Sequence, residues 1–167
     1  LLKIAEGYDG KDRYYVEAFG IGCTDKEEKV YAALRKKRKG KKFDPKYAGL
    51  VWRLHPVSAV NELKGWAMDK DKDDAFRRSM LFAISLIEAP QAATAMVEIA
   101  KNAGGETAKL ASVFIDKRDQ GIWNAYKVKD QLSGKPAGPT VYVDRLAPLE
   151  FGPETKLPKA SKILSLK

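Results

Sequence analysis

The residue best suited to chemistry in this sequence is its one histidine, His55, which stands in the stretch VWRLHPVSAV with Trp52 and Arg53 just before it. A histidine beside a tryptophan and an arginine could ligate haem, act as a general base or help to bind nucleic acid. It also precedes Pro56, and the residue before a proline is disfavoured from the helical region. His55 is therefore expected in an elbow between two helices, with an imidazole nitrogen on a free helix-end carbonyl. A surface contact through Trp52 and His55 stays open as a more specific role.

The other groups that catalysis or metal binding would need are sparse. Cys23 is the only cysteine, so the chain has no intrachain disulfide, no CxxC pair and no CxxCH haem-attachment motif. No second histidine is present to complete a metal site. Carboxylates that alternate with lysines after residue 62 predict a solvated loop and a helix start rather than a paired acid and base. These carboxylates are Glu62, Asp69, Asp71, Asp73 and Asp74. The sequence predicts no catalytic, metal-ligating or cofactor-binding residue.

The positive charge of the chain is concentrated in one place. Lys and Arg outnumber Asp and Glu by 31 to 22, a net charge of +9, and the run RKKRKGKK at residues 35–42 contributes seven of the positive charges. We refer to these residues as the basic run. Such a run is either a solvated helix end or a docking patch for phosphate, anionic lipid or an acidic protein. The candidate docking residues are Arg35, Lys36, Lys37, Arg38, Lys39, Lys41 and Lys42.

The elements that must position these residues are predicted to be helices. Apolar residues recur three and four positions apart, and no strand alternation is found before residue 140, which predicts an all-α fold. Thr24, with Glu27 at capping-box spacing, and the prolines Pro56 and Pro90 mark helix starts. The helices are expected at residues 11–22, 25–38, 46–54, 56–68, 72–87, 89–102, 105–118 and 121–132.

The sequence also repeats at an offset of 33 residues. Five apolar positions recur in three units, three on a first helix and two on a second, and residues 105–132 form a less exact fourth unit. The recurring sets are Tyr14, Tyr47 and Met80; Ala18, Val51 and Ile84; Ile21, Leu54 and Ile87; Val30, Leu63 and Met96; Leu34, Ala67 and Ala100. Units that cannot bury such a stripe alone must stack on their neighbours. This predicts an α-solenoid of stacked antiparallel helix pairs, of HEAT or armadillo type, over residues 1–132.

Residues 133–167 have a different character. They lose the helical periodicity and hold most of the chain's prolines, which predicts an extended tail that links to a following domain. The start of the sequence reads as the last turns of a helix already under way, so the chain is expected to be a piece of a longer protein. No apolar run approaches the roughly 18 residues of a membrane span.

Several stretches carry a resemblance to a known family. LLKIAEGYDGKDRYYVEAFGIG, WRLHPVSAVNELKGWAMD, PQAATAMVEIAKN, DKRDQGIWNAY and the ending LPKASKILSLK resemble the helical-repeat segment of large exported dehydrogenase-like proteins of planctomycetes and related bacteria. In that family a β-propeller resembling sorbosone or glucose dehydrogenases precedes HEAT-like helices, and a c-type cytochrome domain follows them. The resemblance implies a periplasmic or otherwise extracytoplasmic spacer, with haem c on an adjacent domain and none on this chain. The basic run is not a feature of the family.

Two functions follow as expectations. The first is a non-catalytic helical-repeat scaffold or spacer within a larger cytochrome-linked dehydrogenase-like protein, which positions domains or binds a partner for electron transfer. The alternative is a small basic HEAT-like nucleic-acid-binding protein, similar to DNA glycosylases, which the charge and three tryptophans would fit. A groove that tracks phosphates needs cations spread along successive repeats, whereas here they lie in one run. The sequence therefore favours the scaffold.

Overall fold

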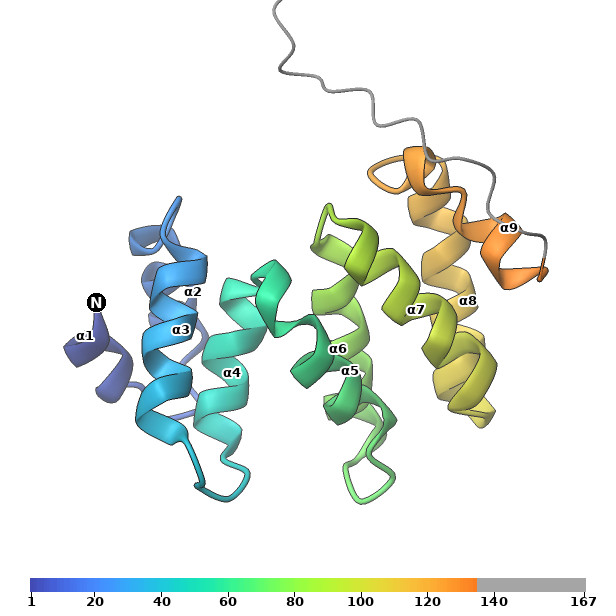
Figure 1. Ribbon diagram of the computed structural model, residues 1–167. Coiled ribbons are helices and arrows are strands. Elements are labelled where there is room, and N and C mark those ends of the chain that lie inside the picture. The colour runs from blue at the N-terminus through green and yellow to red at the C-terminus, as the bar shows by residue number, and fades with distance from the viewer. Residues whose placement is uncertain (135–167) are drawn as a thin grey trace, which may run out of the picture.

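The computed structural model describes residues 1–134 of the chain. All elements of this part are helical, which confirms the predicted all-α class (Figure 1). The predicted tail at 133–167 lies outside the described residues except for its first two. No helix of the described part has the length and apolar character needed to cross a membrane. The elements are α1 (Leu2–Glu6), α2 (Arg13–Gly22), α3 (Glu27–Arg38), α4 (Pro45–Leu54), the 3-10 helix η1 (Val57–Ala59), α5 (Val60–Met68), α6 (Asp74–Leu86), α7 (Pro90–Asn102), α8 (Gly105–Asp119), the 3-10 helix η2 (Asn124–Tyr126) and α9 (Val128–Leu132).

Aspartates set the starts of three helices of the described part. Asp12, Asp44 and Asp73 precede α2, α4 and α6, and each side chain accepts a hydrogen bond from a backbone N–H of the first turn. A carboxylate at this position satisfies an otherwise unpaired donor and is favoured by the helix dipole. The predicted cap at Thr24 is wrong, because its hydroxyl donates instead to the Ile21 carbonyl at 2.8 Å. Helix α3 begins three residues after Thr24, with no side-chain cap.

The helices contact one another in two rows. In the first row α2 contacts α4, α4 contacts α6 and α6 contacts α8; in the second, α3 contacts η1, α5 contacts α7 and α7 contacts α9. The most extensive contacts join the rows, between α5 and α6 and between α7 and α8. Figure 1 shows the helices following one another from α1 at one end to α8 and α9 at the other. The predicted helix at 121–132 is wrong over its first half, since residues 124–126 form the 3-10 helix η2 and α9 begins only at Val128, after Lys127 with its left-handed φ of 48°.

The core runs through both rows. The residues predicted for it in α4 to α7 are buried, except that Trp66 is partly buried and packs against the rest. Trp123 is fully buried, and its indole N–H donates to the Ile87 carbonyl at 2.8 Å. This bond ties the segment after α8 to the end of α6. The residues that apolar spacing predicts for one continuous core are Trp66 together with Leu50, Val51, Leu54, Val60, Leu63, Ile84, Ile87, Met96 and Ile99, and all of them except Trp66 are buried.

The 33-residue repeat fails in the first helix of its first unit. The side chains of Tyr14 and Ile21 were expected in the core but are 88% and 69% exposed. The buried residues are instead Val16 and Phe19 of α2 and Cys23, which directly follows this helix. These three stand 31 residues, not 33, before the buried positions of α4. The second helices keep the offset of 33, since Val30 and Leu34 of α3 are buried like their counterparts in α5.

Candidate functional site

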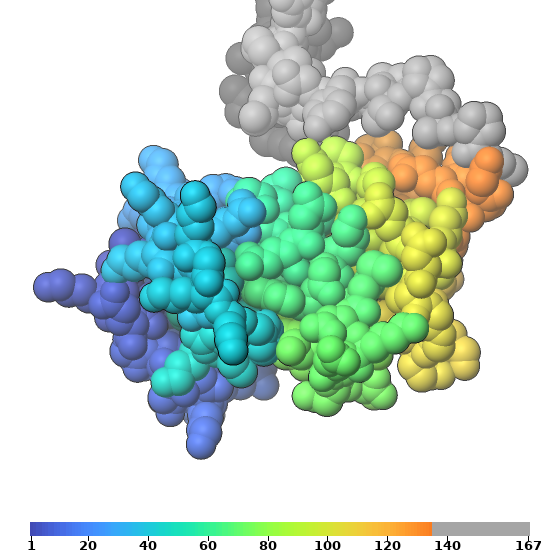
Figure 2. All heavy atoms as spheres, turned by 60° about the horizontal axis from the view of Figure 1, so that its bottom comes forward, coloured from blue at the N-terminus to red at the C-terminus, as the bar shows by residue number. Residues whose placement is uncertain are grey.

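The basic run forms one wall of a groove. The groove has a volume of about 770 Å³ and is lined by residues of α3, of the loop at 39–44, of α4, of η1 and of α5. Six of the seven candidate docking residues line it, and Lys37 does not. We refer to this cavity as the basic groove. Figure 2, which brings forward the end where the loop at 39–44 lies, shows the cyan segment near residue 40 beside the green of α5.

Arg38 fixes the loop that forms this wall. Its guanidinium donates to the Asp44 carboxylate at 2.6 Å and also to the Lys42 carbonyl, and it lies 5.2 Å from the centre of the Tyr47 ring. Asp44 at the same time accepts a hydrogen bond from the N–H of Lys46 at 3.0 Å and so caps α4. The loop between α3 and α4 is therefore tied to both helices through one arginine.

Five cations of the basic run project from this wall without a partner. Lys37 pairs with Glu6 at 2.5 Å and Arg38 with Asp44, but the other five make no ion pair with any residue of the described part. All five are exposed and line the groove. We refer to them as the rim cations: Arg35, Lys36, Lys39, Lys41 and Lys42.

A carboxylate lies inside the groove, opposite these cations. Glu62 of α5 accepts two hydrogen bonds on the same oxygen, Oε2, from the hydroxyl of Tyr31 at 2.9 Å and from that of Tyr47 at 3.1 Å. Both tyrosines are buried, and burial together with the neighbouring Glu62 raises the pKa of each hydroxyl well above its ordinary value. They therefore stay protonated and act as donors. Within residues 1–134 no donor reaches the second oxygen of Glu62, Oε1.

Aromatic side chains form the remaining surface of the groove. Trp66 meets Phe43 and Tyr47 edge to face, with ring centres 5.9 and 6.0 Å apart. The ring of Phe43 is covered by the ammonium of Lys72 at 4.0 Å, as that of Tyr47 is by Arg38. Cations of the chain itself thus cover one face of the Phe43 ring and one face of the Tyr47 ring.

His55 and Trp52 lie outside the groove. His55 ends α4 in a left-handed conformation, φ 31° and ψ 52°, and its Nδ1 lies 3.2 Å from the Trp52 carbonyl oxygen. A carbonyl only accepts, so His55 is the donor in this contact and its Nδ1 carries a hydrogen. Burial lowers the pKa of His55 below its ordinary value. The indole N–H of Trp52 is buried and meets no acceptor among the described residues.

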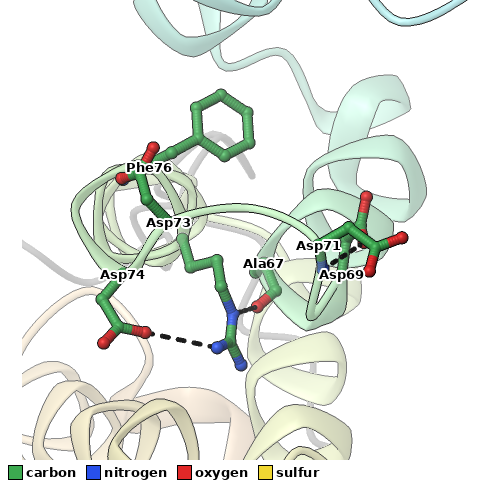
Figure 3. Close-up of polar contacts among 7 residues, drawn as sticks. Ala67, Asp69, Asp71, Asp73, Asp74 and Phe76 are labelled. Atoms are coloured by element: carbon green, nitrogen blue, oxygen red, sulfur yellow. Dashed lines mark hydrogen bonds and ion pairs between the residues drawn. The ribbon is translucent and has the colours of Figure 1, made fainter.

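The carboxylates between α5 and α6 serve local structure. Asp73 caps α6, Asp69 accepts from the N–H of Asp71 at 3.0 Å, and Asp74 accepts from Arg77 at 3.3 Å. Figure 3 shows the side chain of Asp74 on the opposite side of the loop from those of Asp69 and Asp71. In the described part of the chain no three acidic, histidine or cysteine side chains come together as a metal site.

The sequence predicts the cationic wall of the groove but not the residues inside it. Its pattern places Glu62 among the loop carboxylates and Tyr47 in the apolar stripe. Glu62 and Tyr47 come into contact with Tyr31 only when α3, α4 and α5 pack together, and no local sequence pattern predicts this contact. The sequence holds one partial indication of this contact. A tyrosine at a buried stripe position, such as Tyr47, needs a hydrogen-bond partner for its hydroxyl, but the sequence does not indicate which residue that partner is. No protein-family model, curated protein or solved structure matches this chain.

Proposed function

We propose that this chain is a non-catalytic helical-repeat scaffold whose basic groove docks an acidic segment of a partner protein. One observation carries this: five cations that have no ion-pair partner among residues 1–134 line the wall of a groove, two of them on α3 and three on the loop that Arg38 ties to Asp44. Unpaired charges of one sign beside a concave surface attract ligands of the opposite sign. Because Arg38 already holds this loop in place through Asp44 and the Lys42 carbonyl, the loop loses less conformational entropy when a ligand binds.

The scaffold part of the proposal is an α-solenoid of stacked antiparallel helix pairs. Its support is the pattern of contacts, in which helices of one row touch the next but one along the chain. Such stacking buries an apolar stripe that a single pair would leave in water. The buried positions of α4 and α6, 33 residues apart, fit the same arrangement.

The place of the scaffold in a larger protein belongs to the same proposal. The resemblance described above implies a spacer between a dehydrogenase-like propeller and a c-type cytochrome, outside the cytoplasm. In that setting the basic groove would hold an acidic segment of a neighbouring domain or of an electron-transfer partner. Haem c would then lie on the adjacent domain.

Nucleic acid is the second candidate, because the rim cations suit phosphates. One feature weighs against it. The ring of Tyr47 is buried beneath Arg38, and one face of the Phe43 ring is covered by Lys72, so these faces are not open for base stacking, which is worth roughly 1–3 kcal/mol per base.

A charge-matched pair of variants tests the proposal. In the rim variant all five rim cations are replaced by serine. In the control variant five exposed cations away from the groove are replaced by serine: Lys3, Lys11, Arg13, Arg78 and Lys117. Both lose the same charge, and neither should lose much stability, since exposed charges contribute little.

Fluorescence anisotropy with a labelled peptide of alternating Asp and Glu gives the measurement. We expect the rim variant to bind at least about tenfold more weakly than the parent, and the control variant within about twofold. Affinity for the parent should fall steeply between about 50 and 200 mM salt. Equal weakening in both variants would mean that net charge alone drives binding and would contradict a docking site. Tighter binding of a DNA competitor, with the same dependence on the rim, would favour the nucleic-acid alternative.

A further inference from the structure

Glu62 is an unusual component of a groove that attracts anions. One other carboxylate lines the groove, that of Asp44, and it is already engaged by Arg38 at 2.6 Å and by the N-terminus of α4. Glu62 has two partners, but both are neutral hydroxyls, which stabilise its negative charge without cancelling it. The groove therefore combines a positive rim with a negative charge inside.

The two tyrosines also fix the direction of the Glu62 carboxylate. Tyr31 and Tyr47 come from two different helices and are only 1% and 6% exposed, so their hydroxyls are held in place by the core. Both donate to Oε2, at 2.9 and 3.1 Å. The second oxygen, Oε1, accepts from no described residue and belongs to a side chain that lines the groove. A carboxylate held in this way is a pre-organised acceptor for a donor brought by a ligand.

We propose that Glu62 is a specificity determinant of the basic groove, which takes a peptide segment whose acidic residues contact the rim cations and whose one basic side chain binds Oε1 of Glu62. This inference rests on the proposed docking of an acidic segment and adds the requirement for a single cation within it. Trp66, which lines the same groove, offers apolar surface to the alkyl stem of that side chain. A uniformly acidic segment would place like charge against Glu62 and bind less well.

A purely structural role for Glu62 makes a different prediction. If Glu62 only accepts the two hydroxyls, then Glu62→Gln should change nothing in binding, because an amide oxygen can also accept both bonds. Glu62→Gln removes the charge and keeps the shape, so it separates the two roles. Circular dichroism and thermal unfolding of the variant check that the fold is kept.

The test compares two acidic peptides that differ at one position. One carries a lysine at its centre and the other carries acetyl-lysine there, which removes the charge but keeps the stem. We expect the parent protein to prefer the lysine peptide about tenfold, and Glu62→Gln to lose that preference. The rim variant should bind both peptides more weakly and keep their ratio.

The outcomes of this test separate the role of Glu62 from the proposed docking of an acidic segment, on which that role rests. If the parent binds both peptides equally, and both depend on the rim cations, the acidic docking site stands and the role of Glu62 is overturned. If neither peptide binds the parent, the proposed function falls as well. The peptide comparison needs only the unchanged protein, so it tests the inference even if Glu62→Gln fails to fold.

Discussion

His55 combines two structural tasks in one residue. It takes the left-handed conformation that ends α4, and its ring donates to the Trp52 carbonyl at 3.2 Å. The neutral ring suits both tasks, because burial penalises the charged form. This leaves His55 as the one imidazole through which pH can act on the fold.

Stability should fall as His55 takes up a proton. Burial holds the pKa of the folded His55 below 6.5, whereas the unfolded residue titrates near that value. As the pH falls through about 6.5 the unfolded chain binds a proton that the folded chain does not, so the free energy of unfolding decreases. The slope should stay under about 1.4 kcal/mol per pH unit, because a single imidazole differs by at most one proton between the folded and unfolded states.

The comparison variant is His55→Asn, measured by urea unfolding between about pH 5.5 and 8. Asparagine tolerates the left-handed region and does not titrate. The stability of the parent relative to His55→Asn should be constant above about pH 7.5 and decline below about 6.5. A relative gain for the parent at low pH would mean that the fold favours the imidazolium.

At this scale the sequence predicted the position of His55 but not the setting of Glu62. The elbow follows from the proline after His55, a constraint between neighbouring residues. The bonds of Glu62 to Tyr31 and Tyr47 join positions 31 and 15 residues apart. Their formation depends on how three helices come together, which no local rule specifies.

Among the elements, α2 shows how a connection sets the register of a helix. Cys23, which follows α2 directly, stands seven residues before the buried Val30 of α3, whereas Leu54 of α4 stands nine before Leu63 of α5. The separation of the buried positions is thus two residues longer across the elbow after α4, which contains η1. The buried positions of α2 and α4 are thus 31 residues apart, whereas those of α3 and α5 are 33 apart. An offset of 33 applied to α2 therefore selects residues on its exposed face.

Two substitutions in α2 test this register. Phe19→Ala should lower the free energy of unfolding by about 3–5 kcal/mol, because the ring is buried. Ile21→Ser should change it by no more than about 0.5 kcal/mol, because Ile21 is 69% exposed. Chemical denaturation of both variants gives the values. Comparable losses would place the predicted stripe in the core after all.

For the whole molecule, the row-like contacts predict a gradient of local stability. Helices α5, α6 and α7 each contact neighbours on both sides, whereas α1 has five residues and its main contact is with α3 alone. In stacked repeats the stability of each unit depends on its neighbours. Amide hydrogen exchange should therefore be slowest in α5 to α7 and fastest in α1 and α9. Uniform protection across all helices would indicate one cooperative unit and contradict the solenoid proposal.

The all-helical character of the described part could be predicted from the sequence, because apolar spacing reports directly on helices. The departures from the predicted helices have local causes. The predicted helix at 121–132 is broken by the left-handed Lys127, and the cap predicted at Thr24 is replaced by a turn in which its hydroxyl bonds to Ile21. The groove could be predicted only as a charged wall, since its volume depends on the spacing of α3, α4 and α5.

The exposed rim cations also bear on how fast a partner would be captured. A cluster of like charges that is not cancelled by neighbours among residues 1–134 extends its field into solvent over a Debye length, about 8 Å at physiological ionic strength. Such a field orients an acidic partner before contact and raises the association rate constant, which falls steeply as salt increases. Dissociation depends more on the short-range contacts formed inside the groove. The rim cations would then govern the rate of encounter, and Glu62 the lifetime of the complex.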